Sequence, residues 1–223
     1  MIAFVNCRDR VTCTRALVSW LERQPNIRII LIDNASTYAP LLAFYRSTKH
    51  EVVRLPSNVG HTALWNAGVL PRYVSNVNER YLYSDPDVVP AESCPPDTLA
   101  HLSRILDRHP RLAKVGLGLR IDDLPDRCAI KPNVIRWEKK FWTQAIEAGV
   151  YRAQVDTTFA LYRNPAVGYC HEPAARTGPP YVARHTPWYI DSAHLDEEER
   201  YYRAHARLDI TSWNRAELAK HLR

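Results

Sequence analysis

Two aspartates that stand one residue apart, Asp85 and Asp87, are the side chains of this sequence best placed to do chemistry. They follow an apolar stretch, residues 80–84, that is typical of a buried strand. Residues i and i+2 of an extended backbone point to the same side, so both carboxylates would lie together at the end of that strand. Such a concentration of negative charge is costly unless a cation binds it. The alternative is a turn in which Pro86 fixes the backbone and both aspartates are solvated.

The first half of the chain alternates between strand-like and helix-like segments. Near-continuous apolar runs predict four strands, at residues 2–5, 27–32, 52–55 and 80–84. Apolar residues at helical spacing predict three helices between them, at residues 13–24, 40–47 and 63–69. This alternation predicts an α/β protein with a Rossmann-like, doubly wound and mostly parallel sheet flanked by helices.

Polar residues follow three of these predicted strands. Asp33 follows the second strand, Asn58 follows the third, and Asp85 with Asp87 follow the fourth. Ligands of doubly wound sheets bind at the carboxyl ends of the strands, so we expect these side chains to meet at one edge. That arrangement favours a binding site over three unrelated turns.

The second half of the chain is less regular. The patterns predict a helix at 96–108, a strand at 115–121, a helix with two tryptophans at 136–147 and a strand at 154–162. The two glycines within 115–121 permit a close backbone approach. Residues 164–187 contain several prolines and predict a loop that serves as a mobile lid. The acidic residues 196–199 begin a C-terminal helix, where negative charge is favourable.

The composition is that of a soluble globular chain with a basic excess. The net charge is +6, and 24 of the 30 basic residues are arginine. Arginine suits bidentate phosphate contacts, but these arginines are scattered, which favours a nucleotide ligand over a nucleic acid. No apolar run is long enough to span a membrane and residues 2–5 are too short for a signal peptide, so we expect a cytoplasmic location. The five cysteines are scattered and predict neither a zinc site nor a disulfide framework.

Several short motifs together resemble glycosyltransferase family 2, the nucleotide-sugar enzymes of GT-A fold. The matching segments are Ile-Asp-Asn-Ala-Ser at 32–36, Asn-Val-Gly-His at 58–61, Asn-Ala-Gly at 66–68 and Ser-Asp-Pro-Asp at 84–87. Their order and spacing fit over residues 2–120, and residues 155–159 and 184–189 match more loosely. The resemblance implies a single GT-A domain over residues 1–223. Residues 1–120 would bind the nucleotide-sugar, and residues 121–223, with the lid at 164–187 and the C-terminal helices, would bind the acceptor.

The resemblance also implies a metal-dependent transfer from a UDP-, GDP- or dTDP-linked sugar, with Mn²⁺ or Mg²⁺ as the cofactor. A divalent cation stabilises the charge that develops on the leaving diphosphate. Asp87 is expected to bind the metal directly, and Asp85 to contact both the ribose and the metal shell. His185 is either a third ligand carried by the lid or a histidine that caps a turn before Pro187. The residues expected to bind the nucleotide are Asp33, Asn34, Ser36, Asn58, Gly60, Asn66, Asp85 and Arg184.

The acceptor hydroxyl needs a general base, which in the resembled family is an acidic residue well after the metal motif. Asp156 fits best, and Asp122 and Asp123 are the competing candidates. With Asp156 as the base, the transfer would invert the anomeric configuration. Two further interpretations stay open. Arg176 either clamps the diphosphate with Arg184 or is solvated, and Trp137 with Trp142 forms either an apolar acceptor platform or part of a helix core.

The expected acceptor is a glycan or a lipid-linked glycan, with at most peripheral contact at the inner face of a membrane and no nucleic acid. Two other functions fit the same sheet. One is a nucleotidyltransferase-like enzyme, although residues 6–10 lack the glycine of a phosphate loop. The other is a non-catalytic module that binds a nucleotide or RNA. No dinucleotide or ATP phosphate-loop motif is present in the sequence.

Overall fold

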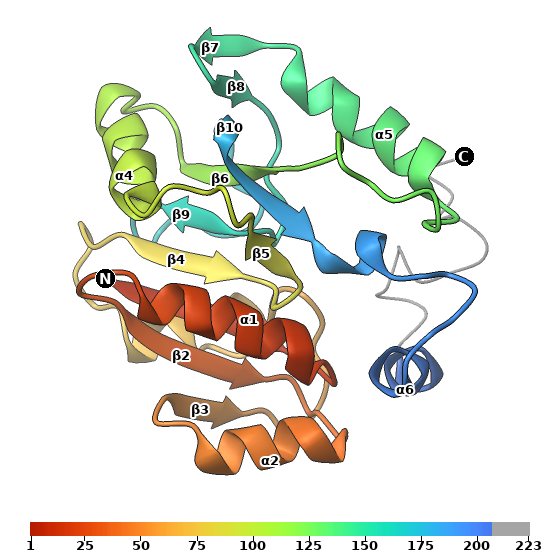
Figure 1. The fold of residues 1–223 in the computed structure, drawn as a ribbon. Coiled ribbons are helices and arrows are strands. Elements are labelled where there is room, and N and C mark those ends of the chain that lie inside the picture. Colours follow the sequence, from red (N-terminus) through yellow and green to blue (C-terminus); the bar gives the residue numbers. More distant parts are fainter. Residues whose placement is uncertain (207–223) are drawn as a thin grey trace.

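The computed structural model of the chain describes residues 1–206, which form a ten-stranded sheet with helices against it (Figure 1). The strands are β1 (Ile2–Cys7), β2 (Arg28–Asp33), β3 (Glu51–Arg54), β4 (Tyr81–Ser84), β5 (Val88–Pro90), β6 (Lys114–Leu119), β7 (Ala145–Glu147), β8 (Val150–Arg152), β9 (Ala160–Tyr162) and β10 (Ala174–His185). The α-helices are α1 (Val11–Glu22), α2 (Ala39–Ser47), α3 (Ala63–Asn66), α4 (Thr98–Arg108), α5 (Lys131–Lys139) and α6 (Glu197–His205). Short 3₁₀ helices are η1 (Leu70–Arg72), η2 (Lys140–Trp142) and η3 (Thr186–Tyr189).

Alternate residues of the central strands face opposite layers of the protein. Ala3, Val5 and Cys7 of β1 pack in a core cluster with residues of α1 and α4, whereas Ile2 and Phe4 pack in a second cluster with residues of α3. Because both faces of the sheet are covered, every residue of β1 is buried, which explains the continuous apolar run in the sequence. The α/β architecture predicted from the sequence is confirmed.

The first four strands run parallel in the order β3-β2-β1-β4. Their carboxyl ends therefore lie at one edge of the sheet, as the alternation predicted. Strand β9 then inserts antiparallel between β4 and β6, and β6 continues in parallel with β10. The sheet ends with the antiparallel strands β8 and β7, while β5 pairs with the last residues of β10.

The prediction of a lid loop at 164–187 is wrong for its second half, because residues 174–185 form β10. This strand lies inside the sheet, with β6 on one side and β8 and β5 on the other. Its prolines are tolerated because the pairing with β6 shifts register between Thr177 and Val182, which places Pro179 and Pro180 at an irregularity. Pairing with distant strands, rather than local pattern, makes this segment a strand.

Two other boundaries also differ from the predictions. The helix predicted at 136–147 begins earlier, as α5, and its last residues form β7 instead. The strand predicted at 154–162 is reduced to β9, and residues 153–156 have no regular structure. That irregular stretch carries Asp156, so its backbone is free to present side chains toward a ligand rather than to a neighbouring strand. The further C-terminal helices that were expected lie outside the described residues, apart from α6.

The close backbone approach predicted for the glycines of β6 is confirmed at Gly118. A Cβ atom there would collide with the carbonyl oxygen of Thr177 on β10 and would lie 2.8 Å from the ring of Trp142. We expect Gly118→Ala to destabilise the protein by about 2 kcal/mol, because this backbone cannot move aside. The melting temperature should fall by roughly 5 °C.

The control for this prediction is Gly168→Ala. Its added Cβ atom would meet no atom closer than 3.6 Å, and Gly168 is not among the glycines whose φ lies in the left-handed region. Differential scanning fluorimetry of both variants checks the expectation. Equal melting temperatures for the two would show that β6 and β10 have room between them.

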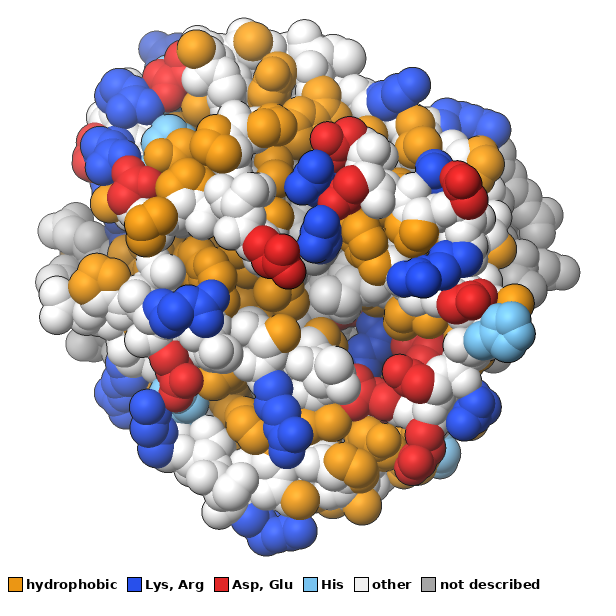
Figure 2. Space-filling view, viewed as in Figure 1, with side chains coloured by type: hydrophobic (Ala, Val, Ile, Leu, Met, Phe, Trp, Pro, Cys, Tyr) orange, Lys and Arg blue, Asp and Glu red, His pale blue; other side chains and the backbone are white. Residues whose placement is uncertain are grey.

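None of the helices within residues 1–206 combines the length and the apolar character needed to cross a membrane. On the face seen in Figure 2, basic side chains are scattered among acidic and hydrophobic ones and do not merge into one continuous basic area.

Candidate active site

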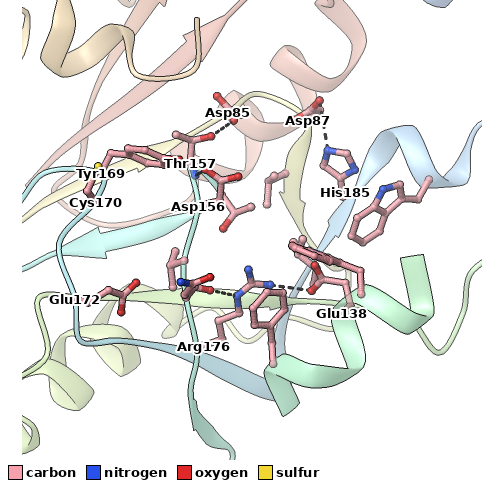
Figure 3. A pocket seen from close by; sticks show the side chains of 18 residues that line it. Asp85, Asp87, Glu138, Asp156, Thr157, Tyr169, Cys170, Glu172, Arg176 and His185 are labelled. Carbon is pink, nitrogen blue, oxygen red and sulfur yellow. Dashed lines mark hydrogen bonds and ion pairs between the residues drawn. The ribbon is translucent and has the colours of Figure 1, made fainter. Parts of the chain in front are cut away.

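A cavity of about 440 Å³ opens beyond the end of β4 and extends to α5. Figure 3 shows Asp85 and Asp87 at one end, Glu138 and Arg176 at the other, and Asp156 between them. The other lining residues come mainly from the irregular stretch before β9, from residues 169–172 and from η3: Val88, Leu119, Trp137, Phe141, Gln154, Val155, Thr157, Thr158, Tyr169, Cys170, Glu172, His185 and Trp188. The size suits a small organic ligand.

Asp85 is held at the base of the cavity by Asn6 of β1 and by Thr157 of the stretch before β9. Its Oδ2 accepts a hydrogen bond from the hydroxyl of Thr157, and its Oδ1 lies 3.4 Å from the amide nitrogen of Asn6 on β1. The backbone amide of Asp85 donates to the carbonyl of Thr157 at 2.9 Å. Burial raises the pKa of Asp85 well above the usual value, and the neighbouring carboxylates of Asp87 and Asp156 raise it further. A cation at this position would offset that cost.

Asp87 lies between a histidine and an arginine. His185 Nε2 is 3.8 Å from Asp87 Oδ2, while Arg10 Nη1 donates to the same oxygen at 2.7 Å. His185 reaches this position because the end of β10 pairs with β5, where His185 lies opposite Val88. The histidine is thus carried by a sheet strand and not by a mobile lid. Burial lowers the pKa of His185, so its imidazole is neutral and available as a ligand.

Arg10 links Asp87 to helix α6, a connection that the sequence patterns did not indicate. Its Nη2 donates to Glu199 at 2.8 Å, and both side chains are almost completely buried. Burial alone would lower the pKa of Arg10, but Asp87, Tyr202 and Glu199 together raise it. The neighbouring Glu198 accepts hydrogen bonds from the first backbone amides of α1, at Val11 and Thr12. The available signal was the position of Arg10 shortly after the carboxyl end of β1, at the same edge of the sheet as Asp33, the last residue of β2.

The side chains around Asp87 fit a divalent cation bound together with a phosphorylated ligand. Within residues 1–206, no three His, Cys, Asp or Glu side chains converge closely enough to bind a metal by themselves. Mg²⁺ in enzymes is commonly held by one or two carboxylates, substrate phosphates and water, so two or three protein ligands suffice. Asp87 and Asp156 lie close enough to Asp85 for their negative charges to raise its pKa beyond the effect of burial. A cation beside these carboxyl groups would relieve that repulsion.

Among the predicted general bases, Asp156 is the one that lines the cavity. Its carboxylate is solvent-exposed, and its Oδ1 accepts a hydrogen bond of 2.8 Å from the backbone amide of Thr157, which fixes its orientation. Asp122 instead pairs with Arg120 at the surface. Asp123 accepts hydrogen bonds from Arg184 and Tyr189, outside the lining of this cavity.

Four of the predicted nucleotide-binding residues hold the loops at the carboxyl edge beside the cavity. Asp33 accepts hydrogen bonds from the backbone amide of Ser36 and from Arg54. Asn34 bonds to the backbone of residues 59 and 60, at 2.9 and 2.8 Å. Gly60 has a φ of +82°, which favours glycine there. Their side chains and backbone therefore shape this edge, whatever direct contact they make with a ligand.

Of the remaining predicted nucleotide-binding residues, Asn58, Asn66 and Arg184 do not line the cavity. Asn58 accepts a hydrogen bond from the Gly60 amide, and the exposed Asn66 donates to Thr62. Arg184 pairs with Asp123 at 2.6 Å, and Arg176 lies at the opposite end of the cavity from Asp87 (Figure 3). Of the two tryptophans, Trp137 lines the cavity, whereas Trp142 packs against Tyr151 and β6.

Fold and cavity together define the class of architecture: it is the GT-A fold, a Rossmann-like sheet with carboxylates after its fourth strand. The structure is similar to that of S. aureus TarS 1–349 in complex with UDP-GlcNAc, with a TM-score of 0.50 and 12% identity. That alignment covers 91% of this chain and 65% of TarS 1–349. A weaker similarity, with a TM-score of 0.45 and 10% identity, links 90% of this chain to 95% of 4-diphosphocytidyl-2C-methyl-D-erythritol synthase.

The other comparisons set limits on what this likeness shows. No family profile and no curated protein matches the sequence. The alignments cover 46% or 65% of TarS 1–349 and 28% of a longer TarS chain, so this chain spans less than two thirds of the length of these neighbours. At these identities the likeness shows a shared fold. The reaction has to be argued from the residues of this chain.

Proposed function

We propose that this protein is a metal-dependent glycosyltransferase that moves a sugar from a nucleoside diphosphate sugar to a hydroxyl group of a glycan or lipid-linked acceptor. The observation that carries the proposal is the meeting of Asp85, Asp87, His185 and Asp156 in one cavity at the carboxyl end of β4. The shared fold with TarS, crystallised with UDP-GlcNAc and with UDP, supports a nucleotide-sugar donor.

In this proposal the residues of the first half bind the donor together with His185 at the end of β10. Asp87 and His185 hold Mn²⁺ or Mg²⁺, and Asp85 positions the ribose and the metal shell. The cation, when bound, stabilises the negative charge of the leaving diphosphate. Arg10 adds a second positive charge at the same place, because its guanidinium already contacts Asp87. The nucleoside itself lies along the edge that Asp33, Asn34 and Gly60 shape.

Asp156 acts as the general base of the transfer. It accepts the proton of the acceptor hydroxyl while that oxygen forms a bond to C1 of the donor sugar. The bond between C1 and the diphosphate oxygen breaks, and its electron pair stays on the nucleoside diphosphate. Because attack and departure occur on opposite faces of C1, the anomeric configuration inverts.

Ligand-dependent stabilisation tests this proposal before any substrate is identified. The protein is heated with UDP, GDP or dTDP, each with and without Mn²⁺. A nucleotide at about 100 times its dissociation constant should raise the melting temperature by roughly 5–10 °C, and only when Mn²⁺ is present. If none of the three nucleotides changes the melting temperature with Mn²⁺, the proposal is contradicted.

Product analysis separates glycosyl transfer from nucleotidyl transfer. A panel of UDP-, GDP- and dTDP-linked sugars with simple glycosides is incubated with the protein and Mn²⁺, and in parallel UTP, GTP and dTTP are incubated with sugar 1-phosphates. Glycosyl transfer or hydrolysis releases a nucleoside diphosphate, whereas a nucleotidyltransferase releases inorganic diphosphate from a nucleoside triphosphate. We expect the nucleoside diphosphate, and inorganic diphosphate as the sole product would replace the proposal with its alternative.

A further inference from the structure

The end of the cavity opposite Asp87 contains a buried ion pair that the proposed transfer does not use. Arg176 Nη1 donates to Glu138 Oε2 at 2.8 Å, and the side chains are 6% and 3% exposed. Arg176 Nε donates to the carbonyl of Gln154 at 2.7 Å, and the guanidinium lies 4.0 Å from the centre of the Phe141 ring. These contacts hold the guanidinium in one plane and one position.

This fixed guanidinium keeps unused donors. Within residues 1–206, Nη2 of Arg176 donates to no other group, and Figure 3 shows it pointing toward the part of the cavity that contains Asp156. Glu138 Oε1 likewise receives no hydrogen bond from the described part of the chain. Both atoms are open to the cavity and not sealed in the core, so a ligand or water in the cavity can complete their hydrogen bonds.

A donor and an acceptor side by side match a hydroxyl group, which both donates and accepts. The cavity also carries apolar ring surfaces, from Trp137, Phe141 and Trp188, against which the C–H face of a sugar ring can pack. Its charge argues against an acidic ligand. Arg176 is already neutralised by Glu138, and Asp156 and Glu172 add further negative charge to the same walls.

We infer that Arg176 and Glu138 form a subsite that binds the hydroxyl groups of a neutral pyranose ring and discriminates against uronic acids. The ring is either the sugar of the nucleotide-sugar donor or the terminal sugar of the acceptor, and in this respect the inference rests on the proposed function. The two residues are specificity residues of the site and take no part in proton transfer. The structural alternative is an ion pair that only joins α5 to β10.

Arg176→Lys tests the inference, because lysine keeps the charge and loses the planar set of donors. Arg163→Lys is the matched control: Arg163 donates only to the backbone carbonyls of residues 106, 109 and 112 among the described residues, and it does not line the cavity. Calorimetry measures the binding of UDP, GDP and dTDP and of their glucose conjugates to both variants and to the unmodified protein. NMR saturation transfer measures the binding of methyl glucoside, methyl mannoside and methyl galactoside without nucleotide.

If the subsite holds the donor sugar, Arg176→Lys should bind the nucleoside diphosphate unchanged and the glucose conjugate at least tenfold more weakly. If it holds the acceptor sugar, the methyl hexosides should lose binding instead, and both nucleotide affinities should stay unchanged. In either case the ligand that binds is compared with its glucuronic acid counterpart. The glucuronic acid form should bind the unmodified protein at least tenfold more weakly than the glucose form.

Two results would overturn the inference. One is an Arg176→Lys variant that binds all these ligands normally, with only its melting temperature lowered, since that is the behaviour of a structural ion pair. The other is a glucuronic acid form that binds as well as the neutral sugar. Failure of the proposed function gives a different pattern, in which no nucleotide binds the unmodified protein while the methyl hexosides still depend on Arg176.

Discussion

Asp87→Ala should lower turnover by about 10³-fold and remove the effect of Mn²⁺ on nucleotide binding. Asp87 contacts both His185 and Arg10, so its loss removes the carboxylate that would bind the metal in the proposed function. The fold should survive, because Arg10 keeps its buried partner Glu199. The measurements are turnover of the nucleotide-sugar that the panel identifies, and the melting temperature with nucleotide, with and without Mn²⁺.

Asp122→Asn is the matched control for this variant. Asp122 also follows a strand and also pairs with an arginine, but 72% of its side chain is exposed and it lies outside the cavity. Its turnover and its Mn²⁺ response should equal those of the unmodified protein. An Asp87→Ala enzyme that keeps its turnover and its response to Mn²⁺ would place the metal elsewhere.

The first half of the fold could be predicted from local sequence patterns. The apolar pattern of each strand and helix there reflects which of its faces are buried. Strand β2 is a run of apolar residues buried on both faces, and α1 presents its apolar stripe, including Leu17 and Leu21, to one of the same core clusters. Strand β10 was not predictable in this way. Its residues 174–177 pair with β6, about 60 positions away, and its prolines sit at a register shift that only the assembled sheet explains.

The residues of the candidate site likewise differ in whether local sequence could predict them. Asp85 and Asp87 could be predicted because their spacing and their place after a strand are local facts. The arginine that pairs with Asp87 could not be predicted, since Arg10 is 77 positions away, and the ion pair from Arg10 to Glu199 spans 189 positions. Glu138 was missed as well, because its partner Arg176 lies 38 positions away in the sequence. Long-range ion pairs leave no periodic signal in a sequence.

One substitution can decide which residue is the general base of the proposed reaction. Asp156→Asn keeps the shape of the side chain and its hydrogen bond from the Thr157 amide, but an amide cannot accept the acceptor's proton. We expect kcat to fall by roughly 10²- to 10⁴-fold, the usual contribution of a general base. The affinity for nucleotide and Mn²⁺ should change little, because Asp87, His185 and Arg10 are left in place.

Asp123→Asn and Asp122→Asn decide between the candidates. Neither residue lines the cavity, and Asp123 is occupied by Arg184 and Tyr189, so both variants should keep the full kcat. A fully active Asp156→Asn enzyme together with a slow Asp123→Asn enzyme would move the base to the loop after β6.

The anomeric configuration of the product made by the unmodified enzyme provides a second, independent criterion. A single base on the acceptor side of C1 requires an inverted anomeric centre, so retention seen by proton NMR would exclude this role for Asp156 even if its substitution slowed the reaction.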